Sequence, residues 1–411
     1  MKKTIFLFLL LFSILSADQV LTVQRNRGIM RIGPGSYFPV LKVLEYGDNF
    51  LSIGKEDGWY ITVSDGTQGY ISQKVTQERA SQKDIFAEIA GQDVSTKVSR
   101  HGMTAGVKGF GERFTQKLEG NPDFVDIYLK YNLDAYEFLN FKKRTYQDFN
   151  NSLCIEKNKI PAYQGSQYFT FSEIGFGIGI ASQISSLGLY KNRMLQDYIN
   201  RVANLLVLVS ENYDNDVKVF ILDSDLVNAY ACPGGIIFVT KGMLGMVESE
   251  AELACVLAHE LAHINRRHGL QELEERKEHL KSDAMFAEME SEFEELEIEQ
   301  PQHMQKMEEE MEELAFNIYQ TVYNGRLAEY EEEADFIGAI YAARAGYNSS
   351  KMLKLLLRLQ RNNSESTNQH YTQEQLAQRY KWLKQNIKKI NLESSYLENS
   401  FRWVKMKELL K

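Results

Sequence analysis

Hydrophobic and polar positions divide the chain into a β-rich stretch near its start and a helix-rich stretch after it. Between residues 20 and 76, short apolar runs alternate with Gly-containing turns such as Asp57-Gly58, which are typical of hairpins. Five short strands within this stretch predict a small closed all-β barrel over residues 18–78. The clearest strand patterns are Val40–Leu44, Phe50–Ile53, Trp59–Val63 and Gly69–Ile71.

Longer helical periods follow further along the chain. We expect helices around Asp123–Phe141 and over Leu195–Leu208, and a strand over Val217–Leu222. Gly175-Phe-Gly-Ile-Gly179 invites comparison with a nucleotide-binding loop, but the third glycine is missing at the required offset and no strand precedes it. Close helix packing is therefore the preferred interpretation of these glycines.

These patterns predict an α+β fold in which a mostly helical domain with a small sheet follows the barrel. The expected divisions are a mixed connecting region of unknown role at 79–165, the helical domain at 166–390 and a tail at 391–411.

The first residues are those of a targeting segment. Lys2 and Lys3 precede an apolar run, Ile5–Leu15, and the small residues Ser16-Ala17. This order predicts a signal peptide over residues 1–17 and an exported protein, periplasmic or secreted, with membrane association left open. An uncleaved anchor is the alternative. After residue 17 no apolar stretch is long enough to span a membrane.

Three cysteines, Cys154, Cys232 and Cys255, are too few and odd in number for a disulfide framework. Buried free thiols are favoured over one bridge.

The net charge of −9 speaks against a nucleic-acid partner, because such binding depends on neutralising phosphates. Its distribution is uneven: residues 271–314 hold 17 acidic and 4 basic residues, and the rest of the chain is close to neutral. Two interpretations of this acidic insertion stay open. It is either a solvated helical face or a segment that gates the neighbouring site and selects substrates by charge.

The strongest chemical signal is His259-Glu260-Leu261-Ala262-His263, at the end of a stretch with helical period from Ala251. Residues four apart share one helix face, so both imidazoles can reach one metal ion, with Glu260 beside it. A solvated polar face is the alternative. The apolar residues just before His259 oppose it, because they indicate a buried helix whose polar groups need partners.

A third ligand is expected elsewhere, since catalytic zinc takes three protein ligands. Glu331 and Asp335 are also four apart, on a helix that continues to Tyr341. Glu331 can coordinate the ion while Asp335 orients a ligand histidine. Glu329 and Glu332 fit a solvated acidic face.

Four blocks now resemble, in order, the HtpX/BepA-type zinc metalloendopeptidases, relatives of the CAAX prenyl proteases. They are Asp223–Gly235, Phe238–Leu244, Glu250–Gly269 and Glu331–Asp335 with Ala345–Tyr347. The resemblance implies a zincin-type fold, with zinc held by His259, His263 and Glu331, Glu260 as general base and Asp335 in support. It also implies an edge strand near Asn228, Gly234 and Gly235 on which an extended substrate is laid.

The resemblance is looser after this point. Where the family has a His-Pro block followed by an arginine near the metal, this chain has His370-Tyr371 and then Arg379 after a longer gap. His370 and Arg379 are candidate catalytic residues, and a surface loop is the alternative for His370. His268 is not expected to be a ligand. The repeat domain of BepA-type proteins and the spans of HtpX-type proteins are not found.

The β-rich stretch resembles a bacterial Src-homology-3-like domain through Arg31–Pro34, Gly58–Tyr60 and Gly66–Tyr70. Such domains bind cell-wall or peptide ligands, which makes peptidoglycan or envelope proteins candidate partners. A spacer whose Trp59 and Tyr60 only fill the interior is the alternative.

Together these features predict an exported zinc endopeptidase that acts on envelope proteins or peptides, in quality control as the resemblance implies. A chaperone-like or scaffold protein that retains the fold, and an envelope-binding module that depends on its barrel, are the alternatives. The complete set of His259, His263, Glu260 and Glu331 favours catalysis, because a scaffold has no need of a base.

Overall fold

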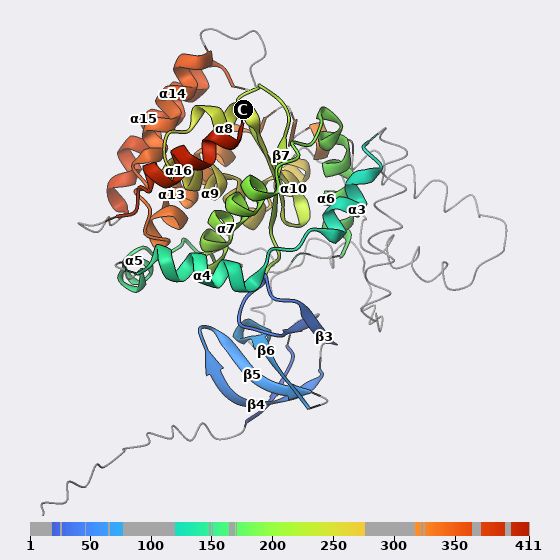
Figure 1. Ribbon diagram of the computed structural model, residues 1–411. Helices are drawn as coiled ribbons and strands as arrows, with labels where there is room; N and C mark the ends of the chain where they lie inside the picture. The colour runs from blue at the N-terminus through green and yellow to red at the C-terminus, as the bar shows by residue number, and fades with distance from the viewer. Residues whose placement is uncertain are drawn as a thin grey trace, which may run out of the picture. The chain divides into compact units, whose positions relative to one another are not determined.

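A computed structural model provides the structure of the protein (Figure 1). It describes residues 19–24, 27–45, 47–64, 66–76, 120–147, 149, 151–163, 169, 171–275, 316, 318–320, 322–323, 325–363, 371–390 and 396–410. The expected signal peptide, His370 and most of the acidic insertion lie outside these residues. The chain divides into two compact units, residues 1–34 with 38–80 and residues 35–37 with 81–411.

The first unit is a six-stranded antiparallel sheet in the order β1-β4-β5-β6-β2-β3. Its strands are β1 (Gln19–Thr22), β2 (Arg27–Arg31), β3 (Val40–Glu45), β4 (Asn49–Glu56), β5 (Trp59–Ser64) and β6 (Thr67–Ser72). The Asp57-Gly58 turn joins β4 and β5 with positive φ at both residues, as a tight hairpin requires.

The all-β character of this unit is as expected, but the prediction that its sheet closes into a barrel is wrong. Among the described strands β1 pairs only with β4 and β3 only with β2, so the sheet stays open at both edges. Trp59 and Tyr60 are buried in this unit, which is what the spacer interpretation requires of them.

The second unit holds a three-stranded sheet among helices. The strands β7 (Lys218–Leu222) and β9 (Ile236–Thr240) are parallel, and β8 (Ala229–Cys232) pairs antiparallel with β9 in the order β7-β9-β8. The described helices are α3 (Asp123–Lys130), α4 (Ala135–Thr145), α5 (Ser152–Lys157), α6 (Phe171–Ile184), α7 (Arg193–Val209), α8 (Lys241–Met246), α9 (Glu250–Arg266), α10 (His268–Glu275), α13 (Ala328–Arg344), α14 (Lys351–Asn363), α15 (Gln373–Asn386) and α16 (Ser400–Lys407). An α+β fold with a mostly helical domain and a small sheet is confirmed.

The region that was expected to be one helix around Asp123–Phe141 forms two. The α4 helix starts afresh because the Asp134 side chain caps it, accepting a hydrogen bond from the Glu137 amide at 2.8 Å. Phe124 of α3 packs on Phe220 and Phe238 of the sheet, and Phe138 of α4 belongs to the same core as α7 and α9. This stretch therefore contributes to the core of the larger unit.

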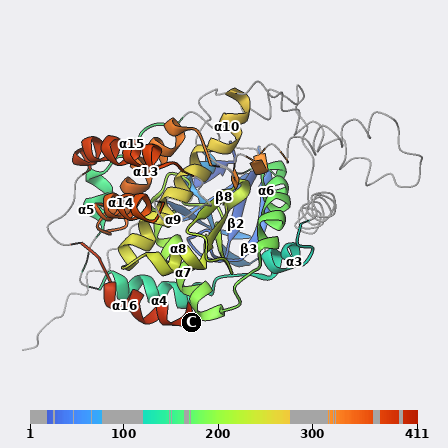
Figure 2. The same cartoon turned by 90° about the horizontal axis from the view of Figure 1, so that it is seen from above.

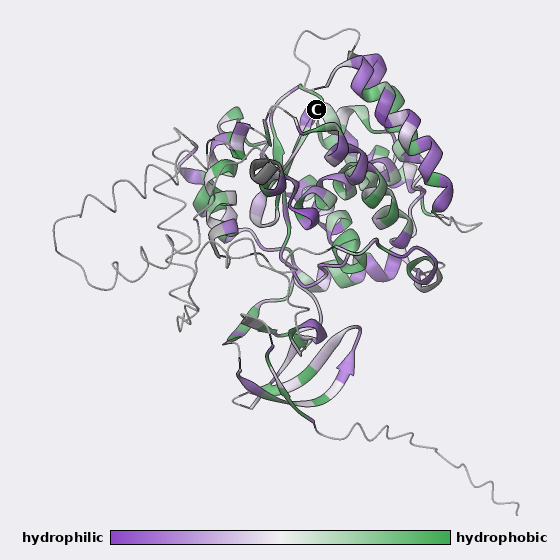
Figure 3. Cartoon of the chain, turned by 180° about the vertical axis from the view of Figure 1, so that it is seen from behind, coloured by the Kyte–Doolittle hydropathy of each residue, from purple (hydrophilic) through white to green (hydrophobic). Residues whose placement is uncertain are grey.

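The α9 helix is buried along its whole length and lies side by side with α13 (Figures 1 and 2). Ser249 caps its start by accepting a hydrogen bond from the Glu252 amide, and Arg267 ends it in a left-handed conformation. Gly338 of α13 permits the close approach, because a Cβ at this position would lie 2.8 Å from the His259 amide nitrogen. The outer helices α14 and α15 carry hydrophilic residues beside hydrophobic ones (Figure 3).

The glycines of Gly175–Gly179 lie within α6. A Cβ at Gly177 would lie 1.9 Å from the Pro233 carbonyl oxygen, so close packing explains this glycine, as expected. All three cysteines are buried and none of them forms a disulfide bond, as expected. No helix in the part of the chain that the structure describes has the length and apolar character needed to cross a membrane.

Candidate metal centre

Two buried helices bring three potential metal ligands together. His259 and His263 lie one turn apart on α9, and Glu331 lies in the first turn of α13. One nitrogen or oxygen from each of the three lies within 4.8 Å of the others. The two Nε2 atoms are 3.0 Å apart, and each lies 3.4 Å from a carboxylate oxygen of Glu331.

The chemistry of this donor set fits a divalent cation. The carboxylate of Glu331 is buried, and its Oε1 accepts no hydrogen bond from the described residues. Two imidazole nitrogens and a carboxylate oxygen converging in a buried space form a ligand set that metal enzymes use, and in such enzymes a water molecule or substrate completes the coordination.

Each histidine is oriented through its other ring nitrogen. The Nδ1 of His259 lies 2.9 Å from Asp335 Oδ1, and the Nδ1 of His263 makes a 2.8 Å hydrogen bond with Nδ1 of His268. The Nε2 of His268 lies 3.4 Å from Glu333. Such partners fix the imidazole orientation and direct both Nε2 atoms at the space beside Glu331. His268 was not expected to be a ligand, and its contact with His263 was not predicted, because it forms only where the chain turns back at Arg267.

Arg379 of α15 joins the two carboxylates. It donates from Nε and Nη2 to Asp335, at 2.8 Å each, and its Nη1 lies 2.8 Å from Glu331 Oε2. Burial favours the neutral acids, but the Arg379 charge and the histidines outweigh it and hold the pKa values of Asp335 and Glu331 below their usual range. Arg379 thus holds the carboxylates of Asp335 and Glu331 in place and keeps them ionised.

Burial and the nearby carboxylates also have opposite effects on the pKa values of the two histidines. Burial opposes protonation of His259, but Asp335 and Glu331 outweigh it and raise its pKa to about 10, so a positive charge at this position is stabilised. Burial dominates at His263 and lowers its pKa well below the usual range. A histidine must be neutral to bind a metal ion, so an ion bound here would replace the proton that Asp335 and Glu331 favour on His259.

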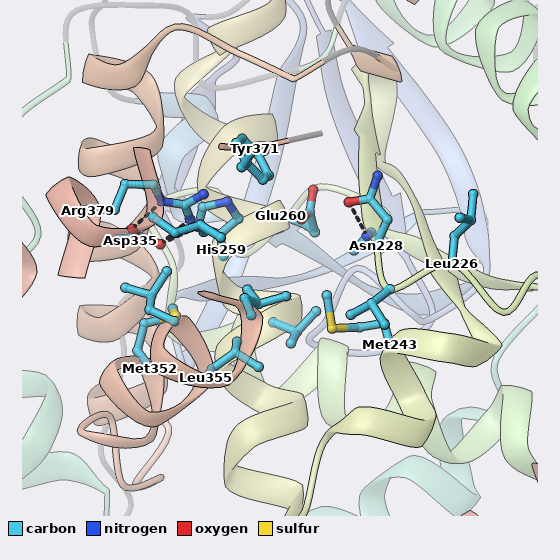
Figure 4. A pocket seen from close by; sticks show the side chains of 16 residues that line it. Leu226, Asn228, Met243, His259, Glu260, Asp335, Met352, Leu355, Tyr371 and Arg379 are labelled. Atoms are coloured by element: carbon cyan, nitrogen blue, oxygen red, sulfur yellow. Dashed lines mark hydrogen bonds and ion pairs between the residues drawn. The ribbon is translucent and has the colours of Figure 1, made fainter. Parts of the chain in front are cut away.

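Glu260 follows His259 on α9 and lines the adjoining pocket (Figure 4). Burial, countered in part by His259, raises the pKa of its carboxyl to about 7. A carboxylate with a pKa near neutrality can both accept and return a proton.

Of the three residues predicted to bind substrate, one lines the pocket and two do not. Asn228 lines the pocket just before β8, and its Oδ1 accepts a 2.9 Å hydrogen bond from the Ala229 amide. Gly234 and Gly235 are buried in the turn between β8 and β9 with positive φ, and they are not among the pocket-lining residues. A Cβ at Gly234 would lie 2.6 Å from the Ile174 Cα, so helix packing accounts for this glycine.

Tyr371 lines the same pocket, where Figure 4 shows it close to His259 and Glu260. Its ring lies 5.0 Å from the Arg379 guanidinium. In the sequence Tyr371 stands out only as a departure from the family pattern, because its approach to the site depends on how α15 packs.

The β8 strand is an edge of its sheet, with β9 as its one neighbour among the described strands. The Ala231 carbonyl accepts a 3.0 Å hydrogen bond from Arg326 Nη2. An edge of this kind offers backbone groups to an extended peptide.

The sequence around these residues is similar to that of known metallopeptidases. Residues 190–392 match the model of peptidase family M48. Over 91 residues the chain is 32% identical to the β-barrel assembly-enhancing protease of Yersinia pestis, covering 22% of this chain and 19% of the relative. The corresponding protease of Escherichia coli is 29% identical over 90 residues, covering 22% of this chain and 18% of the relative.

A eukaryotic relative matches a similar stretch. The mitochondrial metalloendopeptidase OMA1 of Schizosaccharomyces pombe is 36% identical over 90 residues, covering 20% of this chain and 27% of the relative. The chain therefore spans less than a third of the length of each of these relatives.

Proposed function

Residues 190–392 belong to peptidase family M48, and we propose that this metallopeptidase domain is a zinc-dependent endopeptidase that hydrolyses peptide bonds within proteins. The observation that carries the proposal is the buried convergence of His259, His263 and Glu331, with Glu260 beside them. Imidazole and carboxylate ligands in this number are those of catalytic zinc.

Each residue of the site then has a role. His259, His263 and Glu331 would hold the ion, which when bound supplies a Lewis acid that makes water more acidic and polarises the carbonyl of the substrate. Glu260 accepts a proton as water adds to this carbonyl, and returns it to the amine as the C–N bond breaks. Asp335 and His268 orient the two histidines, and Arg379 keeps the carboxylates charged.

The setting of the reaction is proposed on separate grounds. Lys2, Lys3 and the apolar run after them indicate export. Two of the relatives above are named β-barrel assembly-enhancing proteases. Together they support a role in envelope protein quality control, with unfolded or misassembled envelope proteins as substrates, in the periplasm or outside the cell.

The test is Glu260→Gln, with Glu329→Gln as the matched control because Glu329 is exposed on α13. The purified full chain should contain equimolar zinc in all three proteins. Casein cleavage should fall by about 10²–10⁴-fold in Glu260→Gln, since the proton acceptor is lost, and stay unchanged in Glu329→Gln. Protein that takes up no zinc, or equal cleavage by Glu260→Gln and wild type, would contradict the proposal.

A further inference from the structure

The helix α16 carries apolar side chains on two opposite sides. Trp403 is buried and donates a 2.9 Å hydrogen bond to the Val247 carbonyl, which fixes one side of the helix on the core. Phe401 precedes Trp403 by two residues and therefore points to nearly the opposite side. It is 86% exposed, more than any other large hydrophobic residue in the part of the chain that the structure describes. A helix that is apolar on both sides is usually covered on both.

Phe401 has both apolar and positively charged neighbours on its side of α16. Val404 and Lys405 follow it by three and four residues, so the three side chains share one face. Val404 is 53% exposed, and Lys405 is exposed as well. The outer face of α16 therefore combines an aromatic ring, an aliphatic side chain and an ammonium group.

The last turn of α4 adds further positive charge beside this face. The guanidinium of Arg402 lies 4.6 Å from the ring centre of Phe141 and 3.3 Å from the Thr145 hydroxyl, and Figure 2 shows α4 and α16 side by side. The same turn carries Lys142 and Lys143. The α16 surface is defined here as the outer face of α16 with these two lysines: Phe401, Val404, Lys405, Lys142 and Lys143.

Nearby acidic residues leave the α16 surface positive. Glu250 is buried and pairs with Arg402, and Glu398 pairs with Lys351 at 3.2 Å. Glu408 is exposed and follows Phe401 by two helical turns, so it opposes only part of the lysine charge. The surface is thus positive in a chain whose net charge is −9.

We propose that the α16 surface binds the anionic phospholipids of a membrane surface. Phe401 and Val404 enter the boundary between headgroups and acyl chains, and the three lysines contact the phosphates. Lysines around exposed aromatic and aliphatic side chains are typical of helices that lie in a membrane interface, whereas lysine is depleted in protein–protein interfaces. One aromatic side chain and a few lysines give weak, reversible binding. The metallopeptidase domain would then work beside a membrane that it does not enter.

Three variants and one control test this proposal. Phe401→Ser removes the main apolar contact, Lys405→Ala removes one positive charge, and Glu408→Lys replaces the opposing charge. Ile127→Ser is the matched control, because Ile127 is also an exposed apolar residue of a helix but lies on α3, which is distant from α16 in Figures 1 and 2. All four residues are exposed, so thermal melting and casein cleavage in solution should be the same in every variant.

The measurement is flotation of the full chain with lipid vesicles, made either of phosphatidylcholine alone or of equal parts phosphatidylcholine and phosphatidylglycerol. Wild type should bind the anionic vesicles about 10-fold or more tightly than the neutral ones, and added salt should weaken this binding. Phe401→Ser should bind the anionic vesicles about 10-fold more weakly. Lys405→Ala should bind about 5-fold more weakly and Glu408→Lys about 5-fold or more tightly, while Ile127→Ser stays unchanged.

Several results would overturn the proposal. One is equal binding of wild type to neutral and anionic vesicles, and another is the same affinity in wild type, Phe401→Ser and Glu408→Lys. Residues 1–17 are identical in all these proteins, so the ratios of affinity report on the α16 surface. Light scattering tests a second copy of the chain as the occupant: a dimer that Phe401→Ser converts to a monomer would also overturn the proposal. None of these readouts depends on zinc or cleavage, so the proposed peptidase activity is tested separately.

Discussion

His263, one of the three proposed metal ligands, contacts a buried histidine that is not proposed as a ligand. Its Nδ1 contacts His268, which is fully buried and lies near Glu333. This chain of contacts parallels the one between His259 and Asp335, so the two ligands are oriented by partners of different chemistry. A buried histidine that contacts a ligand histidine should therefore affect metal affinity.

We expect His268→Leu to lower zinc affinity by about 10–100-fold, the usual effect of losing such a partner. His268→Asn should retain most of the affinity, because its side-chain oxygen can accept a hydrogen bond from the Nδ1–H that a metal-bound His263 would carry. Competition with a chromophoric chelator measures both. Equal affinities in wild type and His268→Leu would show that the contact is incidental.

The start of α9 is stabilised by the C-terminal helix α16, which lies beyond the matched family region. Glu250 is fully buried and contacts Tyr198, Tyr347 at 2.8 Å, Asn399 at 3.0 Å and Arg402. Trp403 of α16 donates a 2.9 Å hydrogen bond to the Val247 carbonyl, just before α9.

Arg402→Ala should destabilise the protein by about 3 kcal/mol, because it leaves Glu250 buried without its cation. Adding Glu250→Gln should recover part of this loss, and Lys405→Ala, exposed on the same helix, should have little effect. Urea unfolding monitored by circular dichroism compares the variants. If Arg402→Ala and Lys405→Ala unfold at the same urea concentration, α16 does not support α9 in this way.

Contacts between residues within one helical turn could be predicted, whereas contacts that depend on how the chain turns and packs could not. His259, His263 and Glu260 are related by one helical turn, so their spacing was enough to bring them together. The pairing of Arg379 with Asp335, and of His268 with His263, depends on how α15 packs and how the chain turns after α9. The open sheet was missed because local hairpin signals give the strands but not whether the outer two meet.

Across the larger unit, buried tyrosines link stability to alkaline pH. Burial, with smaller contributions from nearby acidic groups, raises the pKa values of Tyr128, Tyr146 and Tyr198 above the ordinary value of 10. In the unfolded chain the same groups lose their protons near pH 10. Stability is therefore complete below pH 10 and falls as the pH rises above it, because deprotonation then favours the unfolded state.

We expect tyrosinate absorbance at 295 nm to rise in two stages, with the buried fraction appearing together with the loss of helical circular dichroism above pH 10. The urea-unfolded protein provides the control, with one transition near pH 10. Complete ionisation near pH 10 with the helical signal intact would contradict this assignment.

Gly338 makes the site sensitive to the volume of the side chain at position 338. The proposed ligands come from α9 and α13, and these helices approach closely where Gly338 carries no side chain. Activity can therefore be lost through volume alone: one methyl group at position 338 would separate the two halves of the ligand set while leaving every donor atom and every charge in place. The close packing of α9 against α13 is therefore required for metal binding just as the donor atoms are.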